Sequence, residues 1–305
     1  MKKLFIILLF AHFSSLSQNE EDILYDSAIR KYDLNDLKGA ISDFEKVLDN
    51  NPNNWDAYYN IALIKKDLND IQGALTDFSI AINKNPDYKE AYLNRGILKD
   101  ILKDYEGAIK DYNKTLEIDS NLTKGYINRG ISFYKLKEYK SAILDYTTAI
   151  KLRPKYAKAF YNRGNAYSLI GKNKEAISDY TYAIRLNPND INSYINRGIL
   201  KDKILSLKEA VFDFSKAIEI DNNYPRIYML RAISKIDLKD FEGAISDYSK
   251  VIEIRSDYRD AYAERGIAYE FLENFKAACY NWNIAAKLGH KNAQEWIELQ
   301  CRKDD

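Results

Sequence analysis

The sequence predicts an all-α solenoid of eight gapless 34-residue helix-turn-helix repeats with a C-terminal capping helix. A phrase of the form Ala-Ile-x-Asp-Tyr/Phe recurs at a fixed step along almost the whole chain. Within each step, apolar residues recur at the spacing of two amphipathic helices. Glycine (12) and proline (5) are scarce among the 305 residues, which suits long helices rather than turn-rich sheets.

The alanine of the recurring phrase fixes the period. It falls every 34 residues, at Ala40, Ala74, Ala108, Ala142, Ala176, Ala210, Ala244 and Ala278. The predicted repeats are therefore residues 21–54, 55–88, 89–122, 123–156, 157–190, 191–224, 225–258 and 259–292. Because one helix hairpin cannot bury its own apolar face, we expect neighbouring repeats to stack on a shared core.

Each repeat is expected to contain a first helix, a short turn and a second helix. Aspartates stand where four of the second helices should begin and can cap their free amides: Asp36, Asp70, Asp104 and Asp240. Ser206 with Glu209 forms the pattern of a capping box in the sixth repeat. Proline stops the second helix in four repeats, at Pro52, Pro86, Pro154 and Pro188. Residues 293–305 are predicted to be a capping helix and tail.

Small residues recur at the eighth, twentieth and twenty-seventh places of the period. Examples from one repeat are Gly198, Ala210 and Ala217. A 34-residue period with this pattern resembles the tetratricopeptide repeat family, and the resemblance covers about nine-tenths of the chain. It implies a right-handed α-solenoid that binds proteins or peptides along a concave groove lined by the first helices.

The first residues have the pattern of an export signal. Lys2 and Lys3 precede a short apolar run that begins at Leu4, and small residues follow at Ser15 and Ser17. We predict a cleaved signal peptide over residues 1–17, a mature lead over 18–20, and a periplasmic or secreted protein. The alternative is a short buried N-terminal helix. No other apolar segment is long enough to span a bilayer.

Charge and motif content argue against two classes of function. Lys plus Arg total 46 and Asp plus Glu total 45, so no basic excess favours nucleic acid. The sequence contains no phosphate-binding loop, metal-ligand cluster or nucleophile motif, and His290 is the one histidine beyond the signal segment. We therefore expect no catalytic residues, no metal site, no cofactor and no enzyme activity.

The sixth place of the period carries asparagine in five consecutive repeats: Asn60, Asn94, Asn128, Asn162 and Asn196. In the tetratricopeptide family this place lies on the concave wall, and the column resembles the asparagine ladder of the O-linked N-acetylglucosamine transferases. Asparagine side chains can pair with a peptide backbone without reading its side chains. The alternative is that asparagine is a framework residue here.

The fifth place stands beside the asparagine column. It holds Tyr59, Leu93, Ile127, Tyr161 and Ile195, which we expect to face the groove in part; the alternative is that they are core. These ten residues form the candidate peptide-binding site. The basic carboxylate clamp of the chaperone-binding family members is not expected, because the fifth and sixth places lack Lys and Arg.

Arginine at the seventh place faces aspartate at the twenty-third within one hairpin. We expect structural ion pairs between Arg95 and Asp111, Arg129 and Asp145, Arg163 and Asp179, Arg197 and Asp213, and Arg231 and Asp247. The eighth repeat places Asn281 opposite Arg265, which should weaken that contact. The alternative is an arginine column for anionic ligands.

Cys279 and Cys301 lie near the C-terminus, in the last second helix and at the end of the cap. An exported protein permits a disulfide between them, and the alternative is two free thiols. The sequence as a whole favours a peptide-binding scaffold. The competing hypothesis is a structural scaffold of an envelope complex that uses its convex or edge surfaces.

Overall fold

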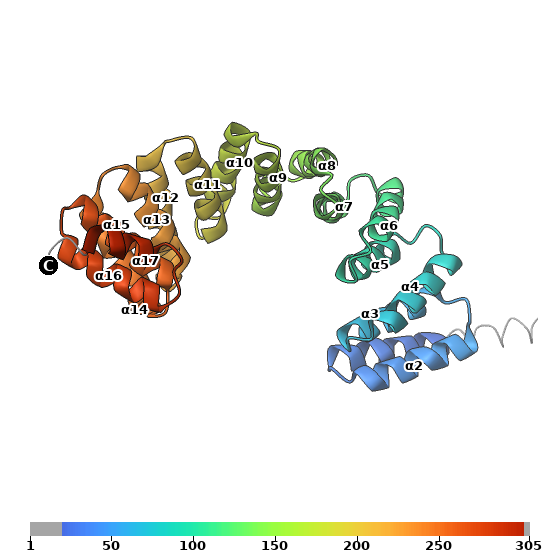
Figure 1. The fold of residues 1–305 in the computed structure, drawn as a ribbon. Coiled ribbons are helices and arrows are strands. Elements are labelled where there is room, and N and C mark those ends of the chain that lie inside the picture. The colour runs from blue at the N-terminus through green and yellow to red at the C-terminus, as the bar shows by residue number, and fades with distance from the viewer. Residues whose placement is uncertain (1–19, 302–305) are drawn as a thin grey trace, which may run out of the picture. The chain divides into compact units, whose positions relative to one another are not determined.

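The computed structural model describes residues 20–301, whose regular elements are all helices, with no strand among them (Figure 1). The predicted signal peptide, residues 1–17, lies outside the described residues. The helices are residues 20–33, α2 (Leu37–Asn50), α3 (Trp55–Asp67), α4 (Ile71–Lys84), α5 (Lys89–Ile101), α6 (Tyr105–Ile118), α7 (Thr123–Lys135), α8 (Tyr139–Leu152), α9 (Ala157–Leu169), α10 (Asn173–Leu186), α11 (Ile191–Lys203), α12 (Leu207–Ile220), α13 (Pro225–Asp237), α14 (Phe241–Ile254), α15 (Arg259–Phe271), α16 (Phe275–Lys287), α17 (Ala293–Trp296) and the π-helical η1 (Ile297–Cys301).

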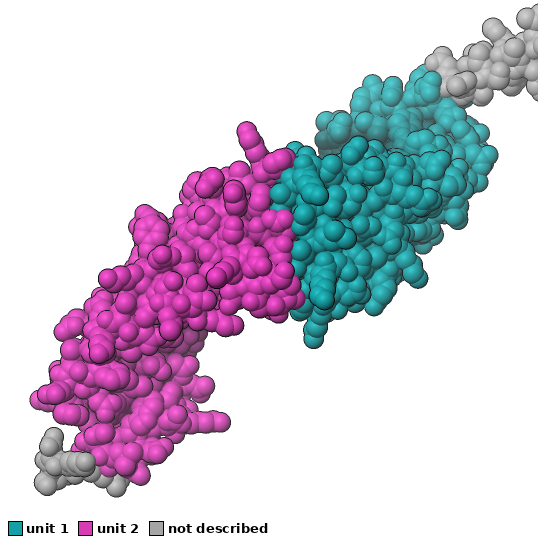
Figure 2. Space-filling model, turned by 90° about the horizontal axis from the view of Figure 1, so that it is seen from above, with its two compact units in different colours: residues 1–153 teal, residues 154–305 magenta. Residues whose placement is uncertain are grey.

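The chain forms two compact units, residues 1–153 and 154–305 (Figure 2). Unit 1 contains the hairpins of repeats 1 to 4, and unit 2 contains those of repeats 5 to 8 and the cap. Within unit 1, the first helices α3, α5 and α7 lie on one side of the stack and the second helices α4, α6 and α8 on the other (Figure 1). The repeated helix hairpin makes the fold an all-α solenoid, as the 34-residue period predicts.

Local sequence explains where the second helices begin. At the four aspartate caps, a carboxylate oxygen accepts a hydrogen bond of 3.0 Å from the backbone N–H three residues on, which belongs to a glycine: Asp36–Gly39, Asp70–Gly73, Asp104–Gly107 and Asp240–Gly243. The capping-box prediction in the sixth repeat is wrong. Ser206 is the N-cap of α12, but its side chain makes no cap hydrogen bond. The carboxylate of Glu209 lies 3.3 Å from the amine of Lys201.

The small residues let the two helices of a hairpin approach. A Cβ atom on Gly96 would lie 2.7 Å from the ring of Tyr112, and one on Gly198 would lie 2.7 Å from the ring of Phe214. These rings belong to a column of buried aromatic residues at the twenty-fourth place: Phe44, Phe78, Tyr112, Tyr146, Tyr180, Phe214, Tyr248 and Trp282. The core of each hairpin is thus a large ring over a glycine or alanine.

The C-terminal cap is shorter and less regular than a full helix. It consists of one α-helical turn, α17, followed by the π-helical turn η1. The indole of Trp296 lies 5.8 Å from that of the buried Trp282, so the cap covers the core of the last hairpin. A disulfide with an S–S distance of 2.04 Å joins Cys279 of α16 to Cys301 of η1.

Candidate functional site

One face of each first helix stays accessible to solvent. It carries the second, sixth, ninth and thirteenth places of the repeat, and we call these four places the first-helix stripe. In α3 they are Asp56, Asn60, Leu63 and Asp67. Steps of four, three and four residues keep them on one side of the helix over about three turns. Throughout the eight repeats, none of these positions is buried.

The asparagines at the sixth place belong to this stripe, but their amides differ. The amide nitrogen of Asn60 donates to the hydroxyl of Tyr25 at 2.8 Å and to the backbone carbonyl of Asp56 at 2.8 Å. That of Asn94 donates to the hydroxyl of Tyr59 at 3.0 Å and to a carbonyl of its own helix at 2.9 Å. Both N–H groups of these amides are therefore engaged, and the Oδ1 atoms are the groups left for a ligand.

Further along the column the pairing changes. Asn196 donates to Oδ1 of Asn165 at 3.1 Å. The amide nitrogens of Asn128 and Asn162 are buried, and neither has a hydrogen-bond partner among the described residues. Asn60 and Asn94 donate to a tyrosine hydroxyl at the fifth place of the preceding repeat. For Asn128 the residue at that place is Leu93, which has no hydroxyl to accept the bond. The five asparagines are thus not equivalent.

The fifth-place residues divide into two kinds. Leu93, Ile127 and Ile195 are only 6%, 3% and 7% exposed, so the expectation that they face the groove is wrong for these three. The fifth place is turned by about 100° from the sixth, toward the second helix, and a short aliphatic side chain there ends in the core. Tyr59 and Tyr161 are half-buried, because their hydroxyls reach the asparagine of the following repeat.

Arginine and aspartate pair within five hairpins, between residues 95 and 111, 129 and 145, 163 and 179, 197 and 213, and 231 and 247. In each, Nε donates to one carboxylate oxygen at 2.8–2.9 Å and Nη2 to the other at 2.6–2.8 Å. The bidentate contact with Asp145 raises the pKa of Arg129.

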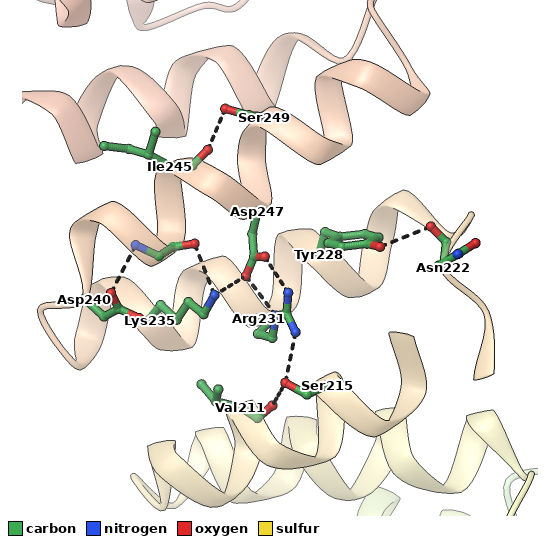
Figure 3. Close-up of polar contacts among 11 residues, drawn as sticks. Val211, Ser215, Asn222, Tyr228, Arg231, Lys235, Asp240, Ile245, Asp247 and Ser249 are labelled. Carbon is green, nitrogen blue, oxygen red and sulfur yellow. Dashed lines mark hydrogen bonds and ion pairs between the residues drawn. The ribbon is translucent and has the colours of Figure 1, made fainter. Parts of the chain in front are cut away.

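The third arginine nitrogen bonds to the preceding hairpin. Nη1 of Arg95 donates to the hydroxyl of Ser79 at 3.0 Å, and Nη1 of Arg231 donates to that of Ser215 at 2.9 Å (Figure 3). Each guanidinium also lies over an aromatic ring of its own helix, as Arg95 does over Tyr92 at 5.6 Å. These contacts occupy the guanidinium groups, which favours a structural role over an arginine column for anions.

The last hairpin departs from this arrangement. Arg265 donates from Nε to Oδ1 of Asn281 at 2.8 Å and from Nη1 to the hydroxyl of Ser249 at 2.9 Å. Asn281 is buried and supplies a neutral amide oxygen where the other hairpins supply a carboxylate. The last hairpin therefore lacks the Arg–Asp ion pair that joins the two helices of the preceding hairpins.

Two groups of polar residues were missed by sequence reasoning. Lysines at the eleventh place also bind the buried aspartates: Lys65 lies 2.6 Å from Asp77, and Lys235 lies 2.9 Å from Asp247. The recurrence of lysine at this place was the available signal. The second group is a set of tyrosines that donate to stripe carboxylates, as Tyr32 does to Asp67 at 2.7 Å.

Between Glu20 and Cys301, no helix is both long and apolar enough to cross a membrane.

Family models of the tetratricopeptide repeat match five stretches of the sequence. The stretches are residues 44–76, 61–122, 130–171, 157–190 and 225–258. This chain is a tetratricopeptide repeat protein. Its repeats make it a protein-interaction scaffold of the kind that binds proteins or peptides.

Several solved structures share the fold. A tetratricopeptide repeat protein from Parabacteroides merdae has a TM-score of 0.59 and 20% identity, covering 85% of this chain and 99% of its own. YrrB, described as having an unusual peptide-binding site, has a TM-score of 0.54 and 24% identity over 60% of this chain and 95% of its own. PilF of Pseudomonas aeruginosa has a TM-score of 0.55 and 19% identity, covering 70% of this chain and 97% of its own. No curated protein matches by sequence.

Proposed function

We propose that this tetratricopeptide repeat protein binds extended or disordered segments of other proteins along the first-helix stripe, and that binding, not catalysis, is its role. The observation that carries the proposal is the stripe itself, which is accessible in every repeat and holds an asparagine at its sixth place in five consecutive repeats. An aliphatic residue stands one turn further along in four of these five, as Leu63 follows Asn60. Amide and aliphatic groups in alternation suit a peptide backbone and its side chains.

The pairing of the amides indicates what they offer. The Oδ1 atoms of Asn60 and Asn94 can accept hydrogen bonds from peptide N–H groups, since the amide nitrogens are held by tyrosines. The amide nitrogen of Asn128 lacks a partner in the fold and can donate to a peptide carbonyl after a small rotation of the side chain. With about 0.5–1.5 kcal/mol for each net hydrogen bond, a few such contacts and some apolar burial correspond to micromolar affinity.

The test is a crosslinking pull-down that compares the parent with the triple variant Asn94/Asn128/Asn162→Ala. The control is Asn83/Asn121/Asn189→Ala, which removes three exposed asparagines outside the stripe. Circular dichroism establishes that all three proteins fold alike. We expect the stripe variant to lose the partners that the parent and the control capture. Equal capture by all three would overturn the proposal.

A specific observation favours the second candidate, a structural scaffold that uses the second helices. The twenty-second place carries large apolar side chains in three repeats, and Leu144, Phe212 and Tyr280 are 68%, 55% and 65% exposed. Exposed apolar side chains at one repeated position suit an assembly contact. Loss of partners from Leu144/Phe212/Tyr280→Ser, with normal capture by the asparagine variant, would select this function.

We also propose that the protein is exported after cleavage of residues 1–17. The disulfide between Cys279 and Cys301 supports this proposal, because disulfides persist in oxidising compartments. The intact mass of the protein purified from its native host tests it. A mature chain that begins at Gln18 is expected, and a chain that retains Met1 to Ser17 would contradict export.

A further inference from the structure

The first-helix stripe changes its charge within unit 1. In the first repeat it reads Asp22, Asp26, Ile29 and Asp33, and in the second Asp56, Asn60, Leu63 and Asp67. In the fourth repeat both ends are basic instead, with Lys124 and Lys135, and both of these lysines are exposed. The stripe is therefore acidic on the first two hairpins and basic on the fourth.

An apolar notch lies between the two acidic stripes. It is lined by Ile29, Tyr32, Phe44, Asn60, Leu63 and Ile64. Its volume of about 10 Å³ corresponds to one water-sized or methyl-sized group. The lining is aliphatic and aromatic apart from the amide of Asn60 and the hydroxyl of Tyr32. The notch therefore fits the tip of a small aliphatic side chain and is too small for a ring.

Carboxylates stand at the two ends of the α3 stripe that borders the notch. Asp56 accepts hydrogen bonds from the hydroxyls of Tyr25 and Tyr88, the second at 3.0 Å. Asp67 accepts one from Tyr32, and this bond, with burial, raises the pKa of Tyr32 to about 12, so the phenol remains a donor. The tyrosines thus fix the carboxylates in place without neutralising them.

Further charges nearby are mostly negative. The exposed Asp26 and Asp33 act electrostatically on the same tyrosines, Tyr25 and Tyr32. The amine of Lys66 lies 3.4 Å from Oδ1 of Asp67 and offsets part of this charge, while Lys31 and Lys65 are paired with the buried Asp43 and Asp77. The surroundings of the notch therefore carry a net negative charge, and an acidic segment would be repelled from it.

The spacing of the two α3 carboxylates suits an extended chain. Asp56 and Asp67 are eleven residues apart, which is about 16 Å along a helix. In an extended segment, side chains at i, i+2 and i+4 point to the same side, and the outer two are about 14 Å apart. Two long basic side chains can therefore reach the two carboxylates while the residue between them enters the notch.

We propose that the first two hairpins select an extended segment in which a small aliphatic residue is flanked, two residues away on each side, by lysine or arginine. This inference rests on the proposed peptide-binding function and names the chemistry of its partner. Within unit 1, Lys124 and Lys135 repel such a segment from the fourth hairpin, which favours the acidic stripes of the first two hairpins.

The test uses the full mature chain and fluorescein-labelled nine-residue peptides, measured by fluorescence anisotropy. The first peptide carries Lys-Ser-Val-Ser-Lys between Gly-Ser flanks. In the second both lysines are glutamate, in the third both are serine, and in the fourth the valine is tryptophan. We expect the first peptide to bind at least tenfold more tightly than the others, with an affinity that falls as salt rises.

Protein variants locate the site. Asp56→Asn/Asp67→Asn is expected to weaken the first peptide at least tenfold. Asp26→Asn/Asp33→Asn, which leaves the tyrosine contacts of Asp56 and Asp67 intact, should weaken it severalfold. The control Glu106→Gln/Glu242→Gln removes the same formal charge from exposed residues of the second helices and should leave the affinity unchanged.

The possible failures are distinguishable. If the serine or glutamate peptide binds as tightly as the lysine peptide and Asn60→Ala/Asn94→Ala weakens both, the stripe binds peptides without selecting charge, and only this inference is overturned. If the lysine peptide binds the parent and the Asp56/Asp67 variant equally, the inference is also overturned. If none of the peptides binds, this inference is overturned, and the proposed function is decided by the pull-down with the asparagine variant.

Discussion

Arg197 and Asp213 form an ion pair that is almost closed to solvent, with side chains 10% and 0% exposed. The guanidinium donates two hydrogen bonds, of 2.9 and 2.6 Å, to the two carboxylate oxygens. The amine of Lys201 lies 3.0 Å from the same carboxylate, so Asp213 compensates two cations. The carboxylate is therefore the centre of the polar framework of the sixth repeat.

Removal of that carboxylate should be costly. We expect Asp213→Ala to lower the free energy of unfolding by about 3–5 kcal/mol, because it leaves a buried guanidinium without its partner. The matched control is Asp257→Ala, since Asp257 is 72% exposed and its ion pair is at the surface. Urea denaturation measures both. Equal losses from the two substitutions would contradict a structural role for the pair.

The last hairpin should gain stability from a carboxylate. Asn281→Asp is expected to raise the free energy of unfolding by about 2 kcal/mol, because Arg265 would then make the bidentate contact seen in five other hairpins. Asn283→Asp, an exposed neighbour on α16, provides a control in which little change is expected. Thermal denaturation of the three proteins decides the point, and a lower melting temperature for Asn281→Asp would refute it.

The disulfide should hold the cap on the last hairpin. It closes a loop of 22 residues, and the chain-entropy model assigns about 3 kcal/mol to such a loop. We expect Cys301→Ser, or reduction of the parent, to speed hydrogen exchange first in α17 and η1. The variant should not respond further to reductant. Unchanged exchange in the cap after reduction would show that packing of Trp296 alone holds it.

The aspartate N-caps should stabilise the fold, whereas the side chain of the serine N-cap, Ser206, should not. Asp104→Ala is expected to cost about 1 kcal/mol, because the side chain accepts the N–H of Gly107 at 3.0 Å. Ser206→Ala removes an N-cap hydroxyl that makes no cap bond, and it should change the free energy of unfolding by much less. Chemical denaturation compares them directly, and similar costs would argue against the assigned caps.

Stability should fall with acid partly through Asp43. Hydrogen bonds from Lys31, Ser27 and Lys46 hold the pKa of this carboxyl well below its usual range. A carboxyl whose pKa is lower in the folded than in the unfolded state stabilises the fold at pH values above its unfolded-state pKa of about 4. This contribution is lost as the pH falls from there through the folded-state pKa. We expect Asp43→Asn to be less stable than the parent at pH 7 and to approach it at low pH. A difference independent of pH would contradict this.

Much of the fold is visible in the sequence because each hairpin is made from contacts within one 34-residue period. The alanine column, the glycine under Tyr112 and the arginine opposite Asp111 all repeat at fixed steps, so the pattern identifies them without knowledge of the neighbours. The structure places these pairs in contact as their spacing predicts.

The candidate site is harder to predict, because it depends on pairs from different repeats. The amide nitrogen of Asn94 donates to Tyr59, 35 residues earlier in the sequence. The amide nitrogen of Asn128 has no such partner, because the equivalent residue is Leu93. The depth of the fifth-place side chains depends on their length, so Tyr161 reaches the stripe and Ile195 does not. A column that looks uniform in the sequence is therefore chemically varied.

In the hydrogen bonds between arginine and the preceding hairpin, the serine has a second partner and the arginine Nη1 group does not. Ser79 donates its own proton to the carbonyl of Leu75 at 2.7 Å, so its hydroxyl keeps a partner when the third hairpin opens. Arg95 has no such second protein partner for Nη1, and opening of the second hairpin removes the hydrogen bond to Ser79. Ser215 and Arg231 repeat this asymmetry in unit 2. Within each unit, fraying from the N-terminal side therefore removes one hydrogen bond from the arginine of the next hairpin, whereas fraying from the C-terminal side leaves the serine hydroxyl of the previous hairpin bonded to its own helix.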